Sequence, residues 1–105
     1  MIPGIPERVF YRIKEVSDLT GLKPHILRYW EKEFRDIRPT KSSRGQRLYQ
    51  KKDLEAIFMI KKLLYEKKFT IDGARMYLST QRSLVEEIKH ELEDIANMLK
   101  KGDAP

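Results

Sequence analysis

Hydrophobic residues recur at steps of three and four along most of the chain, which is the spacing of one face of a helix. The pattern predicts helices over residues 13–20, from residue 24 to within 35–39, and over 51–68, 71–78 and 80–101. Two short β-prone stretches interrupt it, at residues 9–11 and 47–49. The predicted fold class is therefore mainly α, with a small β-hairpin and a C-terminal coiled-coil helix.

The first two predicted helices are separated by a short turn. Gly21 can take the positive φ that ends a helix. Pro24 suits the first turn of the next helix, because an N–H group there would have no hydrogen-bond partner within the helix. Lys23 stands where a serine would cap the second helix, and lysine cannot accept the N–H bonds that serine accepts. Helix, turn and helix predict a helix-turn-helix motif, although an αα-hairpin with no DNA role has the same pattern.

The second helix has an apolar back and a basic, aromatic front. Its back is formed by Ile26, Leu27, Trp30 and Phe34, and we expect Trp30 in the core. Its front is formed by His25, Arg28, Tyr29 and Lys32. Such a helix is typical of a major-groove reader, in which His25 near the helix start can reach a base edge. An ordinary amphipathic helix with a solvated charged face is the alternative.

The segment after this helix is strongly basic. Residues 38–52 contain six lysines and arginines and no acidic residue. A Ser-Ser-Arg-Gly turn precedes the β-prone stretch 47–49, so the segment reads as a hairpin. A basic hairpin directly after a helix-turn-helix is a wing, and Lys41, Arg44 and Arg47 are placed to bind phosphates. A solvated turn that is basic by chance is the alternative.

The last helix carries a regular apolar seam. Its members step by three, four, three and four residues, and they are Val85, Ile88, Leu92, Ile95 and Leu99. Charged and polar residues fill the outside of the helix, and Gly102 ends it. A helix of about 20 residues with such a seam, after a complete domain, predicts a dimerisation element. A helix folded back on its own domain is the alternative.

Charge is distributed unevenly over the chain. The net charge is +6 over 105 residues, and residues 1–52 carry +7 while residues 53–105 carry −1. A basic half joined to a nearly neutral half fits a polyanion-binding module with an appended second element. No stretch resembles a signal peptide or a membrane span, so we expect a cytoplasmic protein with no membrane partner.

Candidate catalytic and metal-binding residues are sparse. The chain has no cysteine, and its two histidines, His25 and His90, lie far apart without partners at ligand spacing. There is no glycine-rich phosphate loop, and the acidic run from Glu86 to Asp94 reads as the exterior of a coiled coil. We therefore expect a protein that is not an enzyme and uses neither a metal nor a cofactor.

Three groups of residues together resemble the N-terminal winged helix-turn-helix of MerR-family transcription regulators. They are Ile13-Lys14-Glu15-Val16-Ser17 with Gly21-Leu22, then Leu27-Arg28-Tyr29-Trp30-Glu31, and Gln46-Arg47-Leu48-Tyr49 about twenty residues later. The similarity continues in residues 53–57 and 69–75 and covers about residues 10–79. Trp30 stands where tyrosine is commoner in the family, and Lys23-Pro24 replaces the usual serine cap.

The resemblance implies roles for several residues. Arg28, Tyr29 and Arg47 would contact the DNA backbone or groove, while Tyr49 would serve either the packing of the hairpin or a phosphate contact. It also implies a homodimer held by an antiparallel pair of C-terminal helices. Such a dimer would bind double-stranded promoter DNA at a two-fold-symmetric site, distort that DNA and assist RNA polymerase.

We therefore expect a flexible arm (residues 1–8), a winged helix-turn-helix domain (9–79), a dimerisation helix (80–101) and a tail (102–105). The expected function is that of a sequence-specific DNA-binding transcriptional regulator. One alternative is an excisionase-like architectural factor that bends DNA. Another is an interaction module that uses the C-terminal helix. In the family that the chain resembles, members that sense a signal use cysteines near the last helix or carry a further C-terminal domain. This chain has no cysteine, and 105 residues leave no room for such a domain. It could therefore be a minimal regulator, a regulator that acts through a protein partner, or a fragment of a longer one.

Overall fold

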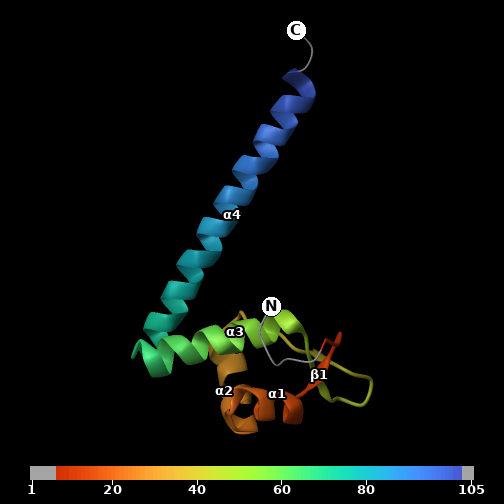
Figure 1. The fold of residues 1–105 in the computed structure, drawn as a ribbon, viewed down its shortest axis with the longest axis vertical. Helices are drawn as coiled ribbons and strands as arrows, with labels where there is room; N and C mark the ends of the chain where they lie inside the picture. The colour runs from red at the N-terminus through yellow and green to blue at the C-terminus, as the bar shows by residue number, and fades with distance from the viewer. Residues whose placement is uncertain (1–6, 103–105) are drawn as a thin grey trace. The chain divides into compact units, whose positions relative to one another are not determined.

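The computed structural model describes residues 7–102 and is mainly α-helical, with one small antiparallel sheet (Figure 1). Its elements in chain order are β1 (Tyr11–Arg12), α1 (Ile13–Thr20), α2 (Pro24–Glu33), β2 (Thr40–Lys41), β3 (Arg47–Tyr49), α3 (Lys51–Lys61), the π-helical turn η1 (Lys62–Glu66) and α4 (Ile71–Gly102). The predicted mainly α, winged helix-turn-helix fold class is confirmed, and its C-terminal helix is long.

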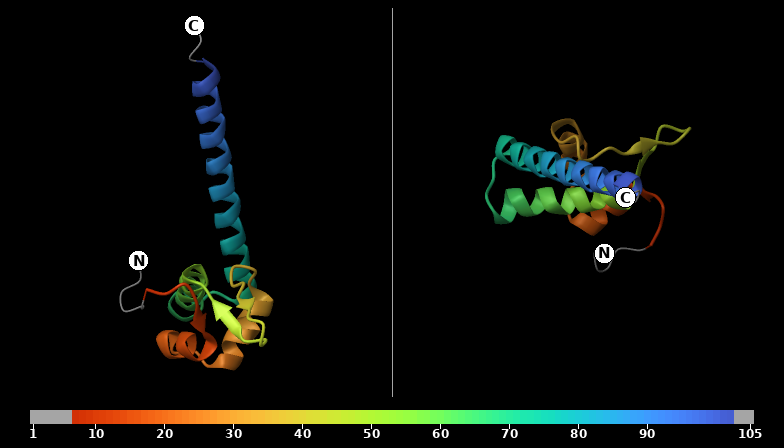
Figure 2. Two further views of the ribbon diagram at one scale, coloured as in Figure 1. Left: turned by 90° about the vertical axis from the view of Figure 1, so that its right-hand side faces the viewer. Right: turned by 90° about the horizontal axis from the view of Figure 1, so that it is seen from above.

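The chain forms two structural units, residues 1–74 and residues 75–105. The first contains the sheet, α1, α2, α3 and η1, and the second is the greater part of α4. In the first unit, α1 and α2 lie on the same side of α3, and the β2–β3 hairpin leads directly into the N-terminus of α3 (Figures 1 and 2).

The core of the first unit is built by side chains from every one of its larger elements. Its fully or almost fully buried members are Tyr11, Val16, Leu27, Trp30, Phe34, Ile37, Tyr49, Leu54, Ile57 and Ile60. Trp30 is 2% exposed, which confirms that it belongs to the core, and its ring lies edge-on to Phe34 with 6.3 Å between centroids. Burial of these large side chains is the main stabilising term of the unit.

The sheet has the strand order β1-β3-β2, with both neighbouring pairs antiparallel. Tyr11 lies opposite Tyr49, and Lys41 lies opposite Arg47. The sequence predicted the return strand at residues 47–49 correctly. The sequence predicts the first strand at residues 9–11, whereas the strand in the structure is Tyr11–Arg12. Val9 lies outside it and is 72% exposed.

Helix α2 ends earlier than its sequence suggested. The sequence predicts its end within residues 35–39, where Pro39 cannot continue a helix, whereas the last helical residue is Glu33. Phe34 leaves the helical region, with φ −123° and ψ 116°, and its N–H donates to the carbonyl of Trp30. This bend allows Phe34 and Ile37 to be buried together, so core packing ends the helix before the proline.

The third and fourth helices also differ from the sequence prediction. The helix expected over 51–68 stops at Lys61 and continues as the π-helical turn η1. Thr70 caps the next helix, because its hydroxyl accepts a 2.9 Å bond from the N–H of Gly73. That helix was expected to stop near Leu78, yet α4 runs unbroken from Ile71 to Gly102. The domain boundary that we place at residue 79 therefore coincides with no break in the helix.

The described end of the arm is held by ion pairs. Glu7 pairs with Lys51 at 2.9 Å, and Arg8 pairs with Glu15 and lies over the ring of Tyr11. The hydrogen bond to Glu7 raises the pKa of Lys51. These contacts involve residues 7 and 8 of the predicted flexible arm, while residues 1–6 and most of the predicted tail lie outside the described residues. The arm as a whole stays a prediction.

Candidate nucleic-acid interface

The turn between α1 and α2 is fixed by local hydrogen bonds. Gly21 has φ 75°, the left-handed conformation expected of it, and its N–H donates to the carbonyl of Ser17. The hydroxyl of Ser17 in turn donates a 2.6 Å bond to the carbonyl of Leu22. Lys23 makes no side-chain cap, as predicted, and Pro24 begins α2. These contacts set the angle at which α2 leaves the turn.

Helix α2 presents its basic and aromatic side to solvent. His25, Arg28, Tyr29 and Lys32 are all exposed, Tyr29 to 48%, whereas Leu27 and Trp30 are buried on the opposite side. Within residues 7–102, none of these four side chains makes an ion pair or a side-chain hydrogen bond. Their charges and donors are therefore available to a ligand.

The hairpin after α2 is shaped by Ser42 and Gly45. The N–H of Ser42 donates to the carbonyl of Gln46 at 2.8 Å, and the Ser42 hydroxyl accepts bonds from the N–H groups of Arg44 and Gln46. Gly45 has φ 78°, which explains the glycine at this place. Lys41 and Arg44 are both exposed on the hairpin.

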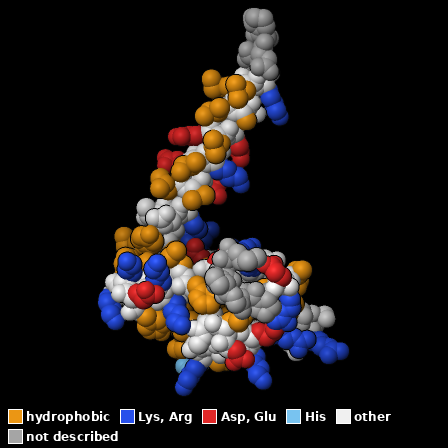
Figure 3. Space-filling view, in the orientation of Figure 1, with side chains coloured by type: hydrophobic (Ala, Val, Ile, Leu, Met, Phe, Trp, Pro, Cys, Tyr) orange, Lys and Arg blue, Asp and Glu red, His pale blue; other side chains and the backbone are white. Residues whose placement is uncertain are grey.

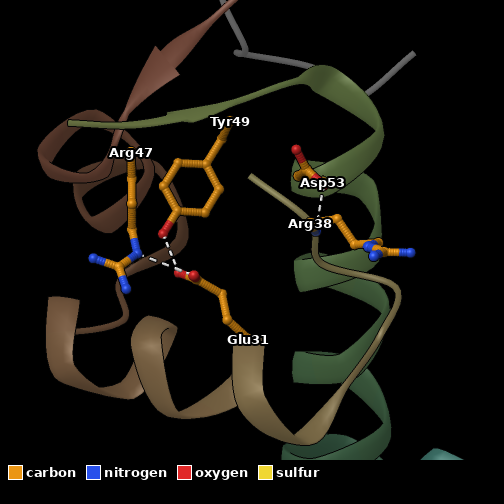
Figure 4. Close-up of polar contacts among 5 residues, drawn as sticks. All are labelled: Glu31, Arg38, Arg47, Tyr49 and Asp53. Atoms are coloured by element: carbon orange, nitrogen blue, oxygen red, sulfur yellow. Dashed lines mark hydrogen bonds and ion pairs between the residues drawn. The ribbon is translucent and has the colours of Figure 1, made fainter. Parts of the chain in front are cut away.

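A carboxylate on α2 connects the helix to the hairpin (Figure 4). Glu31 accepts a 3.0 Å bond from Nε of Arg47 on one oxygen and a 2.5 Å bond from the Tyr49 hydroxyl on the other. The side chain of Glu31 is only 13% exposed and that of Arg47 is 30% exposed. Charge-assisted bonds in such a sheltered place are stronger than surface ion pairs.

The same contact decides the role of Tyr49. Its side chain is fully buried, and burial together with the bond to Glu31 raises its pKa well above the ordinary value near 10. A ring in this position packs the hairpin against the core and has its hydroxyl already bonded. Of the two roles that the sequence left open for Tyr49, this geometry favours packing of the hairpin.

A second carboxylate closes the base of the hairpin (Figure 4). Asp53 is fully buried near the start of α3, and it accepts the N–H of Arg38 at 3.0 Å and that of Gln50 at 2.8 Å. Arg38 and Gln50 are the residues at which the chain enters and leaves the hairpin region. Asp53 therefore joins both ends of the hairpin to α3.

The model of the family described as "MerR HTH family regulatory protein" matches residues 11–81, which is more than half of the chain. The chain belongs to the MerR family. The match covers the whole described helix-turn-helix, the hairpin and the first part of α4. Membership confirms the resemblance that we drew from the three groups of motif residues.

Two curated relatives of this MerR-family chain come from Myxococcus xanthus. It is 27% identical over 71 residues to the HTH-type transcriptional repressor CarA, and 24% identical over 78 residues to the HTH-type transcriptional repressor CarH. The matched regions cover 67% and 74% of this chain but only 25% and 26% of those proteins. The chain therefore corresponds to about a quarter of each relative's length.

A solved structure has the same fold. It is the crystal structure of HiNmlR, a MerR family regulator lacking the sensor domain, bound to promoter DNA. The two structures align with a TM-score of 0.57 over 90% of this chain and 86% of that one, at 15% sequence identity. At that identity the alignment shows the shared fold.

The structure therefore divides the predicted DNA-contacting residues of this MerR-family chain into three kinds. Six are exposed: His25, Arg28, Tyr29, Lys32, Lys41 and Arg44. Arg47 is partly exposed and engaged by Glu31, and Tyr49 is buried. Sequence reasoning assigned no role to Glu31 or Asp53, because neither spacing nor composition shows that a carboxylate faces the hairpin.

The five seam residues of α4 lie exposed along the helix. Val85, Ile88, Leu92, Ile95 and Leu99 have between 52% and 65% of their surface accessible, and Figure 3 shows hydrophobic side chains along one side of α4. Within the described part of the chain, no helix has the length and apolar character of a membrane span. Nor do residues 7–102 gather three acidic or histidine side chains that could hold a metal ion.

Proposed function

We propose that the chain is a sequence-specific transcriptional regulator that binds promoter DNA as a homodimer, with α2 in the major groove and the hairpin on the adjacent backbone. The observation that carries this proposal is the exposed front of α2. A helix that buries Leu27 and Trp30 on one side, and leaves two cations, an imidazole and a phenol unpaired on the other, has the chemistry of a groove reader.

Each front residue has a role that its chemistry suits. Arg28 and Lys32 would neutralise phosphates or bond to base edges, and Tyr29 would donate its hydroxyl to a phosphate. His25, in the first turn of α2, would approach a base edge. The hairpin residues Lys41 and Arg44 would bind phosphates beside the groove, which would add affinity but no sequence preference of their own.

The relatives support the regulatory part of the proposal. CarA and CarH are both described as transcriptional repressors, and HiNmlR is described as a regulator bound to promoter DNA. Repression and activation are both compatible with a protein that binds DNA in this way. Distortion of the bound DNA, through which RNA polymerase would engage the promoter, is part of the proposal and would supply some of the specificity.

The exposed seam of α4 supports the homodimer. Five large aliphatic side chains at heptad spacing, each more than half exposed, are costly to leave in water. A second copy of the same helix is the partner that repeats the same spacing. Two reading helices in one dimer would then bind half-sites separated by one or more turns of DNA.

The test is binding to DNA fragments from around the chain's own gene, measured by fluorescence anisotropy at several salt concentrations. We expect saturable binding to one fragment with a two-fold-symmetric segment. Arg28→Ala should weaken that binding at least tenfold and reduce the salt slope by about one. The matched control is Lys100→Ala, which removes one positive charge from an exposed part of α4.

Two results would contradict the proposal. Equal and steeply salt-dependent binding to every fragment would leave only a basic surface without sequence preference. Equal losses in Arg28→Ala and Lys100→Ala would show that net charge, and not the front of α2, governs binding.

A further inference from the structure

We propose that Glu31 is a positioning residue for DNA binding: it fixes the direction in which Arg47 presents its guanidinium to a phosphate. The inference rests on the proposed function and adds to it a residue that touches no DNA. Its basis is the contact between α2 and the hairpin, where one carboxylate oxygen is bonded to Arg47 and the other to Tyr49.

The geometry leaves the useful part of Arg47 unoccupied. Glu31 receives the Nε–H of Arg47 at 3.0 Å, so the two terminal nitrogens and their four N–H groups remain for another acceptor. In Figure 4 one terminal nitrogen points directly away from Glu31, and the dashed contact to Glu31 comes from Nε alone. A guanidinium held in this way presents the planar fork that matches the oxygens of a phosphate.

Preorganisation is the physical gain. A free arginine side chain has many rotamers. When binding has to order such a side chain, the lost conformational entropy lowers the affinity. Arg47 is ordered before DNA arrives, because Glu31 is itself 13% exposed and is held by the buried Tyr49. The carboxylate also joins the hairpin to α2, so that a phosphate bound by Arg47 is in register with the groove contacts of α2.

The sheet register adds a second reason for a carboxylate here. Lys41 lies directly opposite Arg47 on the neighbouring strand, which places both cations on one face of the sheet. Like charges opposite each other are unfavourable, and Glu31 offsets the repulsion. Among residues 7–102 no acidic side chain pairs with Lys41. One phosphate next to Arg47 would interact with both cations.

The proposal predicts that removing the charge of Glu31 changes the affinity for DNA in the opposite direction to that expected from charge repulsion alone. A carboxylate close to DNA repels phosphates, so its removal without any positioning role would strengthen binding. If Glu31 positions Arg47, its removal instead weakens binding. Glu31→Gln has nearly the same shape and lacks the charge, so the direction of the change in affinity separates the two cases.

The experiment is a double-mutant cycle on the fragment bound by the unsubstituted protein, with Glu31→Gln, Arg47→Ala and the double variant. We expect Arg47→Ala to weaken binding about tenfold and to reduce the salt slope by about one. We expect Glu31→Gln to weaken binding about three- to tenfold, with no further loss when Arg47 is already alanine. Fluorescence of Trp30, the single tryptophan, reports the fold of each variant.

A second variant covers the case in which Glu31→Gln does not fold. Arg47→Lys keeps the charge but has no Nε to anchor and no planar fork to present. We expect it to bind several-fold more weakly with an unchanged salt slope. Unchanged affinity in Arg47→Lys would overturn the proposal. So would tighter binding by Glu31→Gln, or an equal loss with and without Arg47.

Failure of the proposed function gives a different result. In that case the unsubstituted protein itself would show no preferred fragment, and the cycle would have no specific binding to compare. Specific binding by the unsubstituted protein that is sensitive to Arg28→Ala but not to Glu31→Gln would keep the proposed function and reject the positioning role.

Discussion

The ammonium group of Lys61 donates a 2.5 Å hydrogen bond to the main-chain carbonyl of Thr20. Thr20 is the last residue of α1, so the cation from α3 lies at the negative end of the α1 dipole and satisfies one of its free carbonyl groups. This contact joins the helix-turn-helix to α3.

We predict that Lys61→Met lowers the free energy of unfolding by about 1–2 kcal/mol, because α1 loses a charge-assisted bond at its C-terminus. Urea unfolding followed by Trp30 fluorescence measures this, since Trp30 is buried and its ring lies near that of Tyr65 in η1. The control is Lys62→Met at the neighbouring exposed position, where we expect a change within about 0.5 kcal/mol. Equal effects of the two substitutions would contradict the role of the Thr20 contact.

Asp53→Asn tests the closure of the hairpin base. The carboxylate accepts two main-chain N–H bonds in a fully buried place, whereas an amide has one acceptor oxygen and would turn a donor towards one of them. We predict a loss of about 2 kcal/mol in unfolding free energy. Amide hydrogen exchange should accelerate at Arg38 or Gln50, because one of them loses its acceptor.

Glu55→Gln is the matched control for that substitution. It removes the same charge two residues further along α3, at an exposed position. We expect it to leave both the unfolding free energy and the exchange of Arg38 and Gln50 almost unchanged. If Asp53→Asn were as mild as Glu55→Gln, the buried carboxylate would not be holding the hairpin.

The parts of the fold that follow from local rules were predictable from the sequence. Gly21, Pro24 and Thr70 mark element ends through backbone conformation and capping, and each does so in the structure. The end of α2 was not predictable in this way. It depends on burial of Phe34 and Ile37, which is a tertiary effect that overrides the local signal of Pro39.

The candidate site shows the same division. The front of α2 follows from a periodicity of 3.6 residues, so its exposed members were predictable. Glu31 bonds to Arg47, which is 16 positions away in the sequence, and Asp53 bonds to Arg38, which is 15 positions away. No sequence pattern in one chain shows such pairings, because they require the hairpin to be placed against both helices.

Tyr49 should make the protein sensitive to alkaline pH. Burial and the bond to Glu31 raise its pKa in the folded state above the ordinary value near 10 that the unfolded chain retains. Below pH 10 both states keep the proton, and the contribution of Tyr49 to stability is fully present. As the pH rises further, the unfolded state releases the proton first, so the folded state loses up to about 1.4 kcal/mol per pH unit.

The measurement compares unfolding free energies of the unsubstituted protein and Tyr49→Phe between pH 8 and 11. Phenylalanine keeps the packing of the ring and has no proton to lose, so all other alkaline effects are common to both proteins. We predict that the difference in stability is constant below about pH 10 and then shifts in favour of Tyr49→Phe. A constant difference across the range would show that Tyr49 is not protected from deprotonation.

The seam of α4 gives the prediction that bears on assembly. Leu92 is the central member of the seam and is 62% exposed in the single chain. If the chain dimerises through this seam, as we propose, Leu92→Glu should convert the dimer to a monomer, because it places charged carboxylates within an apolar interface. Sedimentation equilibrium measures the mass directly. Glu93→Gln, on the outside of the helix, should leave the dimer intact.

The same variant separates the two ways in which α4 can affect DNA binding. If the dimer joins two reading helices, loss of dimerisation should weaken binding to a two-half-site fragment by at least about 100-fold, because the second contact is no longer intramolecular. Binding to a fragment with one half-site should change little, since the front of α2 and the hairpin are untouched. A monomeric Leu92→Glu that still binds the two-half-site fragment with full affinity would show that each chain recognises DNA independently.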